Sequence, residues 1–190
     1  MGVLLAAHAA THRLAELVAA IDGQHGMRAV LALFEGVVTG AADGYGRMAD
    51  KPAATLLHLG PGLGNGLANL HNARRAMSPV INLVGDHATY HLHYDAPLTS
   101  DAAGVARPTS DFVRISKSNR DLPHAGAEAF VAAQGYPGRI ATVIVPADHA
   151  WDEGAGAVAP IAAPPTPQAP DADIAEAAAA LKAGTRTALF

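Results

Sequence analysis

Short, unbroken apolar runs alternate with longer helix-like segments along most of this chain, and that alternation constrains its fold more than any other feature. The clearest runs are 29–34, 53–59, 79–84 and 141–145. Unbroken runs of this length are typical of strands that are covered on both faces. The repetition of strand and helix predicts an α/β fold, with a three-layer architecture and a mostly parallel central sheet between helices on both faces.

The remaining segments fit the same pattern. Apolar stretches at 3–7 and 112–115 are further candidate strands, and helices are expected at 11–21, 35–48, 63–77 and 123–134. Residues 87–111 have no sustained period and predict a long loop with one short helix, crossing one end of the sheet. Loops of this length are usually functional or mobile.

The composition changes after Trp151, and this change divides the chain. We expect a first domain over 1–152, followed by a Pro- and Ala-rich linker over 153–170. A helix should follow at 171–183, capped by Asp171 or Asp173 and closed by Gly184. Residues 187–190 resemble the beginning of a strand, so 171–190 are interpreted as the start of a truncated second domain.

Composition excludes several classes of protein. The formal net charge is −4 and no basic run is present, so nothing indicates a nucleic-acid partner. The absence of cysteine excludes disulfides and thiolate metal sites. The apolar start lacks the basic flank and the length of a signal peptide, and no apolar stretch is long enough to span a bilayer. A cytoplasmic protein with no membrane partner is therefore expected.

Glu35 is the strongest candidate for chemistry, because it follows an apolar strand and opens an apolar helix. Burial there would raise the pKa of its carboxyl group, whereas the helix N-terminus would favour the anion. A carboxyl group balanced in this way can exchange a proton with a bound heterocycle. The competing interpretation is a glutamate that only caps the helix, and the spacing alone leaves both open.

A glycine-rich segment at 60–65 is expected to form a loop between a strand end and a helix start, where small residues let a ligand approach the backbone. The segment lacks the Lys-Ser/Thr ending of a P-loop. Its glycine spacing also differs from the dinucleotide fingerprint, so a Rossmann-type nucleotide binder is disfavoured. The alternative is an ordinary tight turn. Asn65 is favoured over Asn72 as a polar residue of the site.

Histidines flank this segment and the following strand. His58 lies at a strand end, where it is either a proton-transfer residue or a polar residue satisfied by its neighbours. His87, His91 and His93 lie near Asp86 and Asp95, which makes a metal site conceivable. Nothing in the spacing fixes a coordination geometry, so solvated histidines are favoured and no metal ligand is assigned.

Four motifs, taken in their order along the chain, indicate a family resemblance. They are Ala42-Asp43-Gly44-Tyr45-Gly46-Arg47, Leu57 to Gly66, Ser78 to Asp86, and Val143 to Asp148. Together they resemble the amino-terminal, pyrimidine-binding domain of the thiamine-diphosphate enzymes that include acetolactate synthase, pyruvate oxidase and benzoylformate decarboxylase. The resemblance covers about residues 2–152 and is strongest to acetolactate-synthase-like large subunits.

The resemblance implies a cofactor and roles for particular residues. Glu35 would share a proton with N1′ of the aminopyrimidine of thiamine diphosphate, which promotes loss of the thiazolium C2 proton and attack on a 2-oxo acid. Gly60, Pro61, Gly62 and Asn65 would border the cofactor. His58 falls where benzoylformate decarboxylase has a histidine that assists proton transfer.

The chain also departs from the family pattern. The helix that precedes the first strand is missing, and so is the Gly-Asp-Gly segment that binds the diphosphate and Mg²⁺ in another domain. The sequence therefore predicts a half-site that is inactive alone, needs a diphosphate-binding domain in cis or in trans, and belongs to a homodimer or tetramer. Two alternatives stay open, namely a subunit of a split thiamine-diphosphate decarboxylase and a non-catalytic oligomerisation or binding module.

Overall fold

A computed structural model describes residues 2–7, 15–154 and 156–184, and its centre is a parallel sheet. Six strands make up this sheet in the described part of the chain, in the order β2-β1-β3-β4-β6-β5, and each strand runs parallel to its neighbours. The predicted α/β class is confirmed. The strands are β1 (Gly2–Ala7), β2 (Met27–Ala32), β3 (Ala53–His58), β4 (Val80–Asp86), β5 (Phe112–Ile115) and β6 (Ile140–Pro146).

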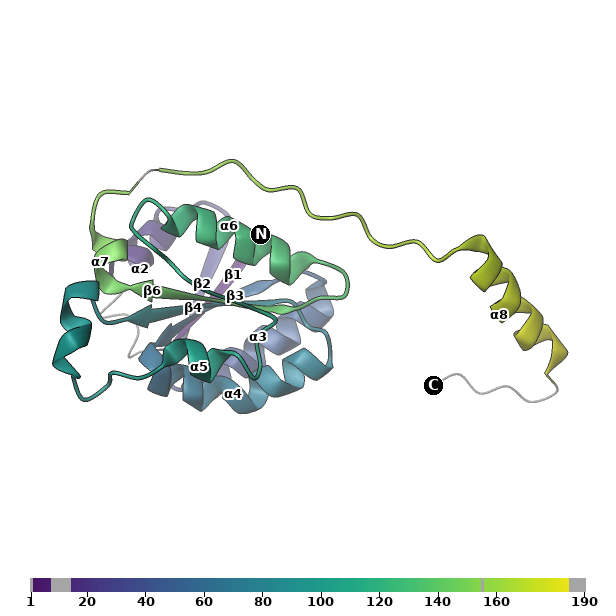
Figure 1. The fold of residues 1–190 in the computed structure, drawn as a ribbon, viewed down its shortest axis with the longest axis horizontal. Helices are drawn as coiled ribbons and strands as arrows, with labels where there is room; N and C mark the ends of the chain where they lie inside the picture. The colour runs from purple at the N-terminus through teal and green to yellow at the C-terminus, as the bar shows by residue number, and fades with distance from the viewer. Residues whose placement is uncertain (1, 8–14, 155, 185–190) are drawn as a thin grey trace.

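Helices cover both faces of the sheet, as Figure 1 shows. One face carries α2 (Ala15–Asp22), α6 (Leu122–Gln134) and α7 (Ala147–Trp151). The other carries α3 (Glu35–Ala49), α4 (Leu59–Arg75) and α5 (Ala102–Ala106). After the neighbouring strands β4 and β6 the chain leaves toward opposite faces, to α5 and α7, and open α/β sheets bind ligands at carboxyl ends of this kind.

The apolar runs form a core on each side of the sheet. Val38, Leu63 and Leu70 of α3 and α4 pack with Val80 and other strand residues on one side. On the other side the alanines of α6 at 125, 129 and 133 pack on Ile81, Val143 and Val145. Every residue of β6 is buried, so a strand covered on both faces is confirmed there.

The same expectation is wrong for β2. The strand ends at Ala32 rather than at Phe34, and Met27 and Leu31 are 41% and 59% exposed. The physical reason is its place at the edge of the sheet, where β1 is its one neighbour among the strands that the structure describes. An apolar sequence there does not imply cover on both faces.

Several predicted boundaries also needed correction. Helix α4 begins at Leu59, four residues before the predicted start, so the glycine-rich segment lies in the helix. Two short helices, rather than one, interrupt the long loop: the 3₁₀ helix η1 (Thr89–Tyr94) and α5. Strand β6 stops at Pro146, so the motif from Val143 to Asp148 ends in the first turn of α7. Residues 11–14 of the first predicted helix lie outside the described residues.

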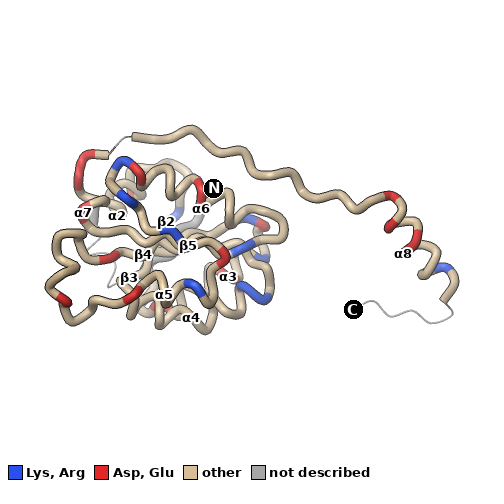
Figure 2. Tube along the Cα trace, in the orientation of Figure 1, with Lys and Arg blue, Asp and Glu red and all other residues tan. Residues whose placement is uncertain are grey.

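The carboxyl-terminal segment runs away from the sheet. Residues 156–170 have no helix or strand, and Figure 2 shows no charged residue along this stretch. Helix α8 (Asp171–Ala183) matches the predicted range, but Pro170 is its N-cap and Asp171 and Asp173 lie in the first turn instead. The predicted strand at 187–190 lies outside the described residues. No helix that the structure describes is long and apolar enough to cross a membrane.

A buried row of polar side chains crosses the middle of the sheet. Thr55 of β3 donates to the Asn82 side-chain oxygen of β4 at 2.7 Å, and the Asn82 amide donates to Thr142 Oγ1 of β6 at 3.0 Å. These three residues are fully buried and are direct partners in the strand register. A shift of either pairing would leave buried polar groups without partners, so the row specifies the register of the three central strands.

Replacing Asn82 with alanine tests this row. The change removes two hydrogen bonds and leaves two buried hydroxyl groups without this partner, so we expect a loss of about 2–4 kcal/mol in the free energy of unfolding. Urea unfolding of the chain followed by circular dichroism measures it. Asn72→Ala, the same change at an exposed position of α4, is the matched control. Equal stability of the two variants would contradict the account.

Candidate functional site

Glu35 is the first residue of α3 and lies close behind the end of β2. The preceding residue, Phe34, is extended, with φ −150° and ψ 139°, and it turns the chain from the sheet edge into the helix. The glutamate is only 8% exposed, although Phe34 remains 49% exposed. A carboxylate in the first turn of a helix is favoured by the helix dipole, so burial there does not require a cationic partner.

The neighbouring helix α4 holds the Glu35 carboxylate. The Asn65 side-chain amide donates to Glu35 Oε2 at 3.1 Å. Gly62 lies against the other carboxylate oxygen, because a Cβ added to it would be 3.2 Å from Glu35 Oε1 and 3.4 Å from His58 Cβ. The structure thus brings together Glu35, His58, Gly62 and Asn65, four of the residues that the sequence predicted.

The two helices approach closely because glycines line their contact. Thr39 Oγ1 of α3 lies 3.1 Å from the carbonyl oxygens of both Glu35 and Gly66, and it is fully buried. A Cβ at Gly66 would be 2.7 Å from Thr39 Cγ2. The Asn69 amide of α4 donates to the Gly36 carbonyl oxygen at 2.6 Å, which fixes the first turn of α3. The sequence did not point to Asn69 or Thr39.

The residues at the start of α4 shape the turn from β3 into the helix. Leu59 has φ 55°, a left-handed conformation that is uncommon for a residue with a Cβ, and it allows the helix to start directly at the strand end. Pro61 is the third helical residue, a position where its missing N–H breaks no helical hydrogen bond. Gly60 is buried against Ser100, so the long loop after β4 folds back onto this turn.

The Asp43 to Arg47 part of the family signature forms a structural junction. Arg47 donates to both carboxylate oxygens of Asp43, at 2.8 and 2.7 Å, and Ser78 Oγ donates to Asp43 Oδ1 at 2.6 Å. Burial acts to raise the pKa of Asp43, but hydrogen bonds from Arg47 and Ser78 and the charge of Arg47 outweigh it and lower that pKa. The junction joins α3 to the start of β4, and no local pattern pointed to Ser78 as its third member.

The histidines after β4 differ in their exposure. Among the described residues, no group of three His, Cys, Asp or Glu side chains is placed to hold a metal ion. His93 is exposed and His91 is half-buried, in keeping with solvated histidines. His87 is different, since it is only 6% exposed, so the expectation of a solvated side chain is wrong for it. The cause is its place directly at the end of a central strand.

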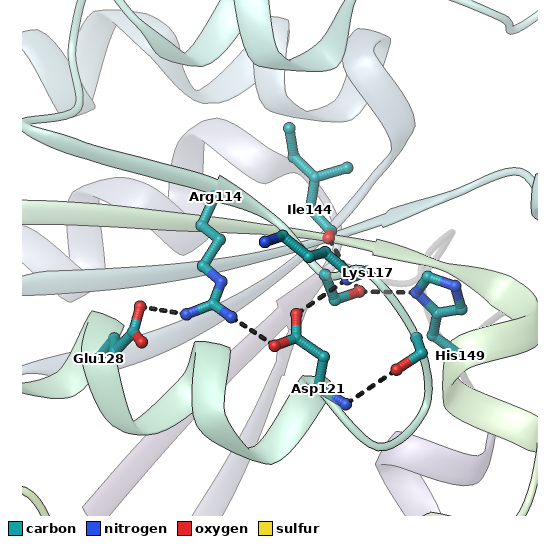
Figure 3. Close-up of polar contacts among 8 residues, drawn as sticks. Arg114, Lys117, Asp121, Glu128, Ile144 and His149 are labelled. Atoms are coloured by element: carbon teal, nitrogen blue, oxygen red, sulfur yellow. Dashed lines mark hydrogen bonds and ion pairs between the residues drawn. The ribbon is translucent and has the colours of Figure 1, made fainter.

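A second polar cluster lies between β5 and α6 and is structural. Figure 3 shows Arg114 between Glu128 and Asp121, and it bonds both carboxylates. Ser116 Oγ lies 2.9 Å from His149 Nδ1, a pairing of the kind found in nucleophilic sites. However, Ser116 is only 2% exposed, and its backbone N–H bonds the Ile144 carbonyl oxygen. This cluster fastens the edge strand and α7 to the sheet.

Comparison with known proteins identifies the family. Residues 5–108, more than half of the chain, match the family described as "Thiamine pyrophosphate enzyme, N-terminal TPP binding domain". The chain belongs to this family. The matched range includes Glu35, Asn65 and both helices of the site, as well as the Asp43 junction.

Similar proteins agree with this assignment. The chain is 54% identical over 167 residues to a Mycobacterium tuberculosis protein provisionally named acetolactate synthase large subunit IlvX, covering 88% of this chain and 32% of the relative. It is 30% identical to Pseudomonas aeruginosa benzoylformate decarboxylase, covering 72% of this chain and 26% of the relative. The crystal structure of benzoylformate decarboxylase from Polynucleobacter necessarius matches with a TM-score of 0.81 and 25% identity, covering 95% of this chain and 33% of that chain. The chain thus spans about a third or less of these relatives.

Substitution of two glycines of α4 tests the close helix contact. Gly66→Ala places a methyl group against Thr39, whose rotamer is fixed by buried hydrogen bonds, so we expect a loss of about 1–3 kcal/mol in stability. Gly64→Ala is the matched control, since its Cβ would meet nothing within 4 Å. That change should add about 0.5–1 kcal/mol, because alanine favours a helix more than glycine does. Urea unfolding of the chain measures both, and equal effects would contradict the contact.

Acid sensitivity tests the Asp43 junction. The pKa of Asp43 in the folded chain lies below its ordinary value of 3.8. The carboxylate therefore contributes stability above the ordinary pKa, and this contribution is lost as the pH falls through the folded value. We expect the free energy of unfolding of Asp43→Asn to be about 1–3 kcal/mol below that of the parent at pH 7. On further acidification, the stability of the variant should fall less than that of the parent. Urea unfolding across this pH range measures the difference.

The control for that experiment is Asp50→Asn at the exposed C-cap of the same helix, where the residue has φ 50° and asparagine is well tolerated. This change removes the same charge without removing the junction. If the two variants lose the same stability at pH 7, the junction does not stabilise the fold.

Proposed function

We propose that this chain supplies the pyrimidine half of a thiamine-diphosphate site in a 2-oxo acid decarboxylase or carboligase, with Glu35 as its proton-sharing acid. The single observation that carries this proposal is the buried Glu35 carboxylate held by Asn65. No ion pair involves Glu35 among the residues that the structure describes. A buried carboxylate that is oriented but not neutralised by a cation can accept or share a ligand proton.

The residues around Glu35 fit a flat nitrogen heterocycle. Asn65 donates to one carboxylate oxygen, which leaves hydrogen-bonding capacity on the other for a protonated ring nitrogen. Gly62 has no side chain to crowd that second oxygen. Leu33 and Phe34, which are 91% and 49% exposed, provide apolar surface just before Glu35. This chemistry of one carboxylate and apolar surface matches an aminopyrimidine rather than a diphosphate.

Each residue then has a distinct task. Glu35 would hold the proton at the pyrimidine N1′, and Asn65 would keep the carboxylate directed toward it. His58, at the end of the adjacent central strand, would move a proton to or from the substrate. When bound, thiamine diphosphate supplies a carbanion that adds to the carbonyl carbon of a 2-oxo acid.

The diphosphate and Mg²⁺ would be held by a separate domain, in cis or in trans. The exposed side of α3 supports such a partner, because Val37 and Met48 are 59% and 89% exposed and Ala41 and Gly44 lie between them at helical spacing. This surface begins within one turn of Glu35. A domain that covers it would also exclude water from the carboxylate, which strengthens the hydrogen bond to a ligand. Helix α8 would then begin a further domain, with residues 153–170 as its linker.

A hybrid enzyme tests the proposal. The chain would replace the matching amino-terminal residues of the Mycobacterium tuberculosis relative, and decarboxylation of pyruvate and benzoylformate would be measured with thiamine diphosphate and Mg²⁺. We expect Glu35→Gln to lower kcat by about 10²–10⁴-fold, because it removes the acid but keeps the shape of the side chain. Glu176→Gln, an exposed position in α8, should leave kcat unchanged and controls for the loss of charge.

The other outcomes separate the alternatives. An active hybrid in which Glu35→Gln has parent activity would reject the role of Glu35. If the isolated chain becomes active when the rest of the relative is added as a separate polypeptide, that result would favour a split enzyme. A hybrid that folds but shows no thiamine-dependent reaction would favour a non-catalytic binding module.

A further inference from the structure

His87 has a buried imidazole at the carboxyl edge of the sheet, and the chemistry proposed for Glu35 does not use it. It directly follows β4 and is only 6% exposed, and its Nε2 atom is buried with no hydrogen-bond partner among the residues that the structure describes. Its backbone N–H donates to Asp86 Oδ1 at 2.7 Å, which fixes the start of the loop. A buried polar atom without a partner is destabilising, so such atoms are rare, and a bound ligand is one of the ways in which they are satisfied.

The strand register places the backbone of His87 at the same edge of the sheet as His58. His58 of β3 is the register partner of Gly85, which lies two residues before His87 on β4. After β4 the chain passes to α5 on one face, whereas after the neighbouring β6 it passes to α7 on the other (Figure 1). In α/β sheets, small ligands bind at the carboxyl ends of neighbouring strands whose following segments leave toward opposite faces.

The loop after His87 contains a second buried polar atom, in the side chain of Thr99. Thr99 Oγ1 also lacks a hydrogen-bond partner within the described part of the chain. The next residue, Ser100, packs against Gly60 in the first turn of α4. The loop is held at its start by Thr89, which donates to Asp148 through its backbone and its hydroxyl group. Both ends of the loop are thus anchored at the edge that carries His58.

The charge pattern leaves His87 as a hydrogen-bond donor that an acidic ligand group could use at this edge. No Lys or Arg occurs in residues 52–73 or 76–106, the two segments that build this edge from β3 and β4. A carboxylate bound here would need donors other than lysine or arginine. Imidazole N–H groups donate to carboxylates with charge-assisted hydrogen bonds, which are stronger than neutral ones.

We propose that His87 binds the substrate, with its Nε2–H donating to the carboxylate of a 2-oxo acid. This inference rests on the proposed function, because the acid is the substrate class expected there. It assigns a role to a residue that the Glu35 chemistry does not use. His87 would orient the acid, whereas Glu35 acts on the cofactor.

Steady-state kinetics of the hybrid enzyme test this assignment. His87→Leu should raise the KM for pyruvate by about tenfold or more, the effect of losing one charge-assisted hydrogen bond. The concentration of thiamine diphosphate that gives half-maximal activity should change less than twofold. His87→Gln should retain more substrate affinity than His87→Asn, because the glutamine amide nitrogen reaches about as far as Nε2. His91→Gln, whose ring centroid is 5.4 Å from that of His87, is the control and should have parent kinetics.

If the hybrid has no activity, a nuclear magnetic resonance titration of the chain itself tests the proposal. Pyruvate should shift the His87 Nε2 resonance, and methyl pyruvate, which lacks the carboxylate, should not. If the hybrid is active, a KM of His87→Leu equal to that of the parent would overturn the proposal. If the hybrid is inactive, a His87 resonance that pyruvate leaves unchanged in the isolated chain would overturn it. Loss of all thiamine-dependent activity with a retained pyruvate shift would instead reject the proposed function and keep the role of His87.

Discussion

The close contact between α3 and α4 is the constraint on which the candidate site depends. Thr39 fits against Gly66 without room for a methyl group, and Asn69 bonds the first turn of α3. This spacing brings Asn65 within hydrogen-bonding distance of Glu35. A wider separation of the helices would leave a carboxylate at a helix end without an orienting donor. Glycines that weaken α4 as an isolated helix are therefore what allows it to form the site.

The sheet and the Asp43 junction hold this helix pair in place. The buried row from Thr55 to Thr142 sets the register of the central strands, and with it the level at which His58 ends β3. Asp43, Arg47 and Ser78 fasten the other end of α3 to the start of β4. The polar residues of this domain thus fall into two groups. One group fixes the fold, and a smaller group at the carboxyl edge of the sheet is available to a ligand.

Much of the architecture could be predicted from the sequence because its physical signals are local. Unbroken apolar runs predicted the central strands, and a carboxylate between strand and helix marked Glu35. The start of α4 could not be predicted in the same way, since glycine and proline normally oppose helices and only tertiary contacts show why they occur there. The partnership of Asp43 with Ser78 joins residues 35 positions apart, and local patterns do not reveal such contacts. Burial of His87 was also missed, because its surroundings in the sequence are polar.

The family assignment and the geometry together support a division of labour between this chain and a second domain. The chain has an oriented acid and apolar surface, which suit the pyrimidine. The described residues offer no group of acidic or histidine ligands for a metal. Under the proposed function, Glu35 activates the cofactor and a second domain anchors it. The exposed Val37 and Met48 of α3 would then contact that second domain.

The role of Glu35 can be measured without any substrate, by exchange of the thiazolium C2 proton of thiamine diphosphate for deuterium, which reports activation of the cofactor alone. In the hybrid enzyme, proton nuclear magnetic resonance of quenched samples would compare the parent with Glu35→Gln at saturating cofactor. The account predicts that the exchange rate of the variant falls by at least about 10²-fold, toward that of free cofactor, while the cofactor remains bound. Exchange at the parent rate in a cofactor-bound Glu35→Gln enzyme would contradict it.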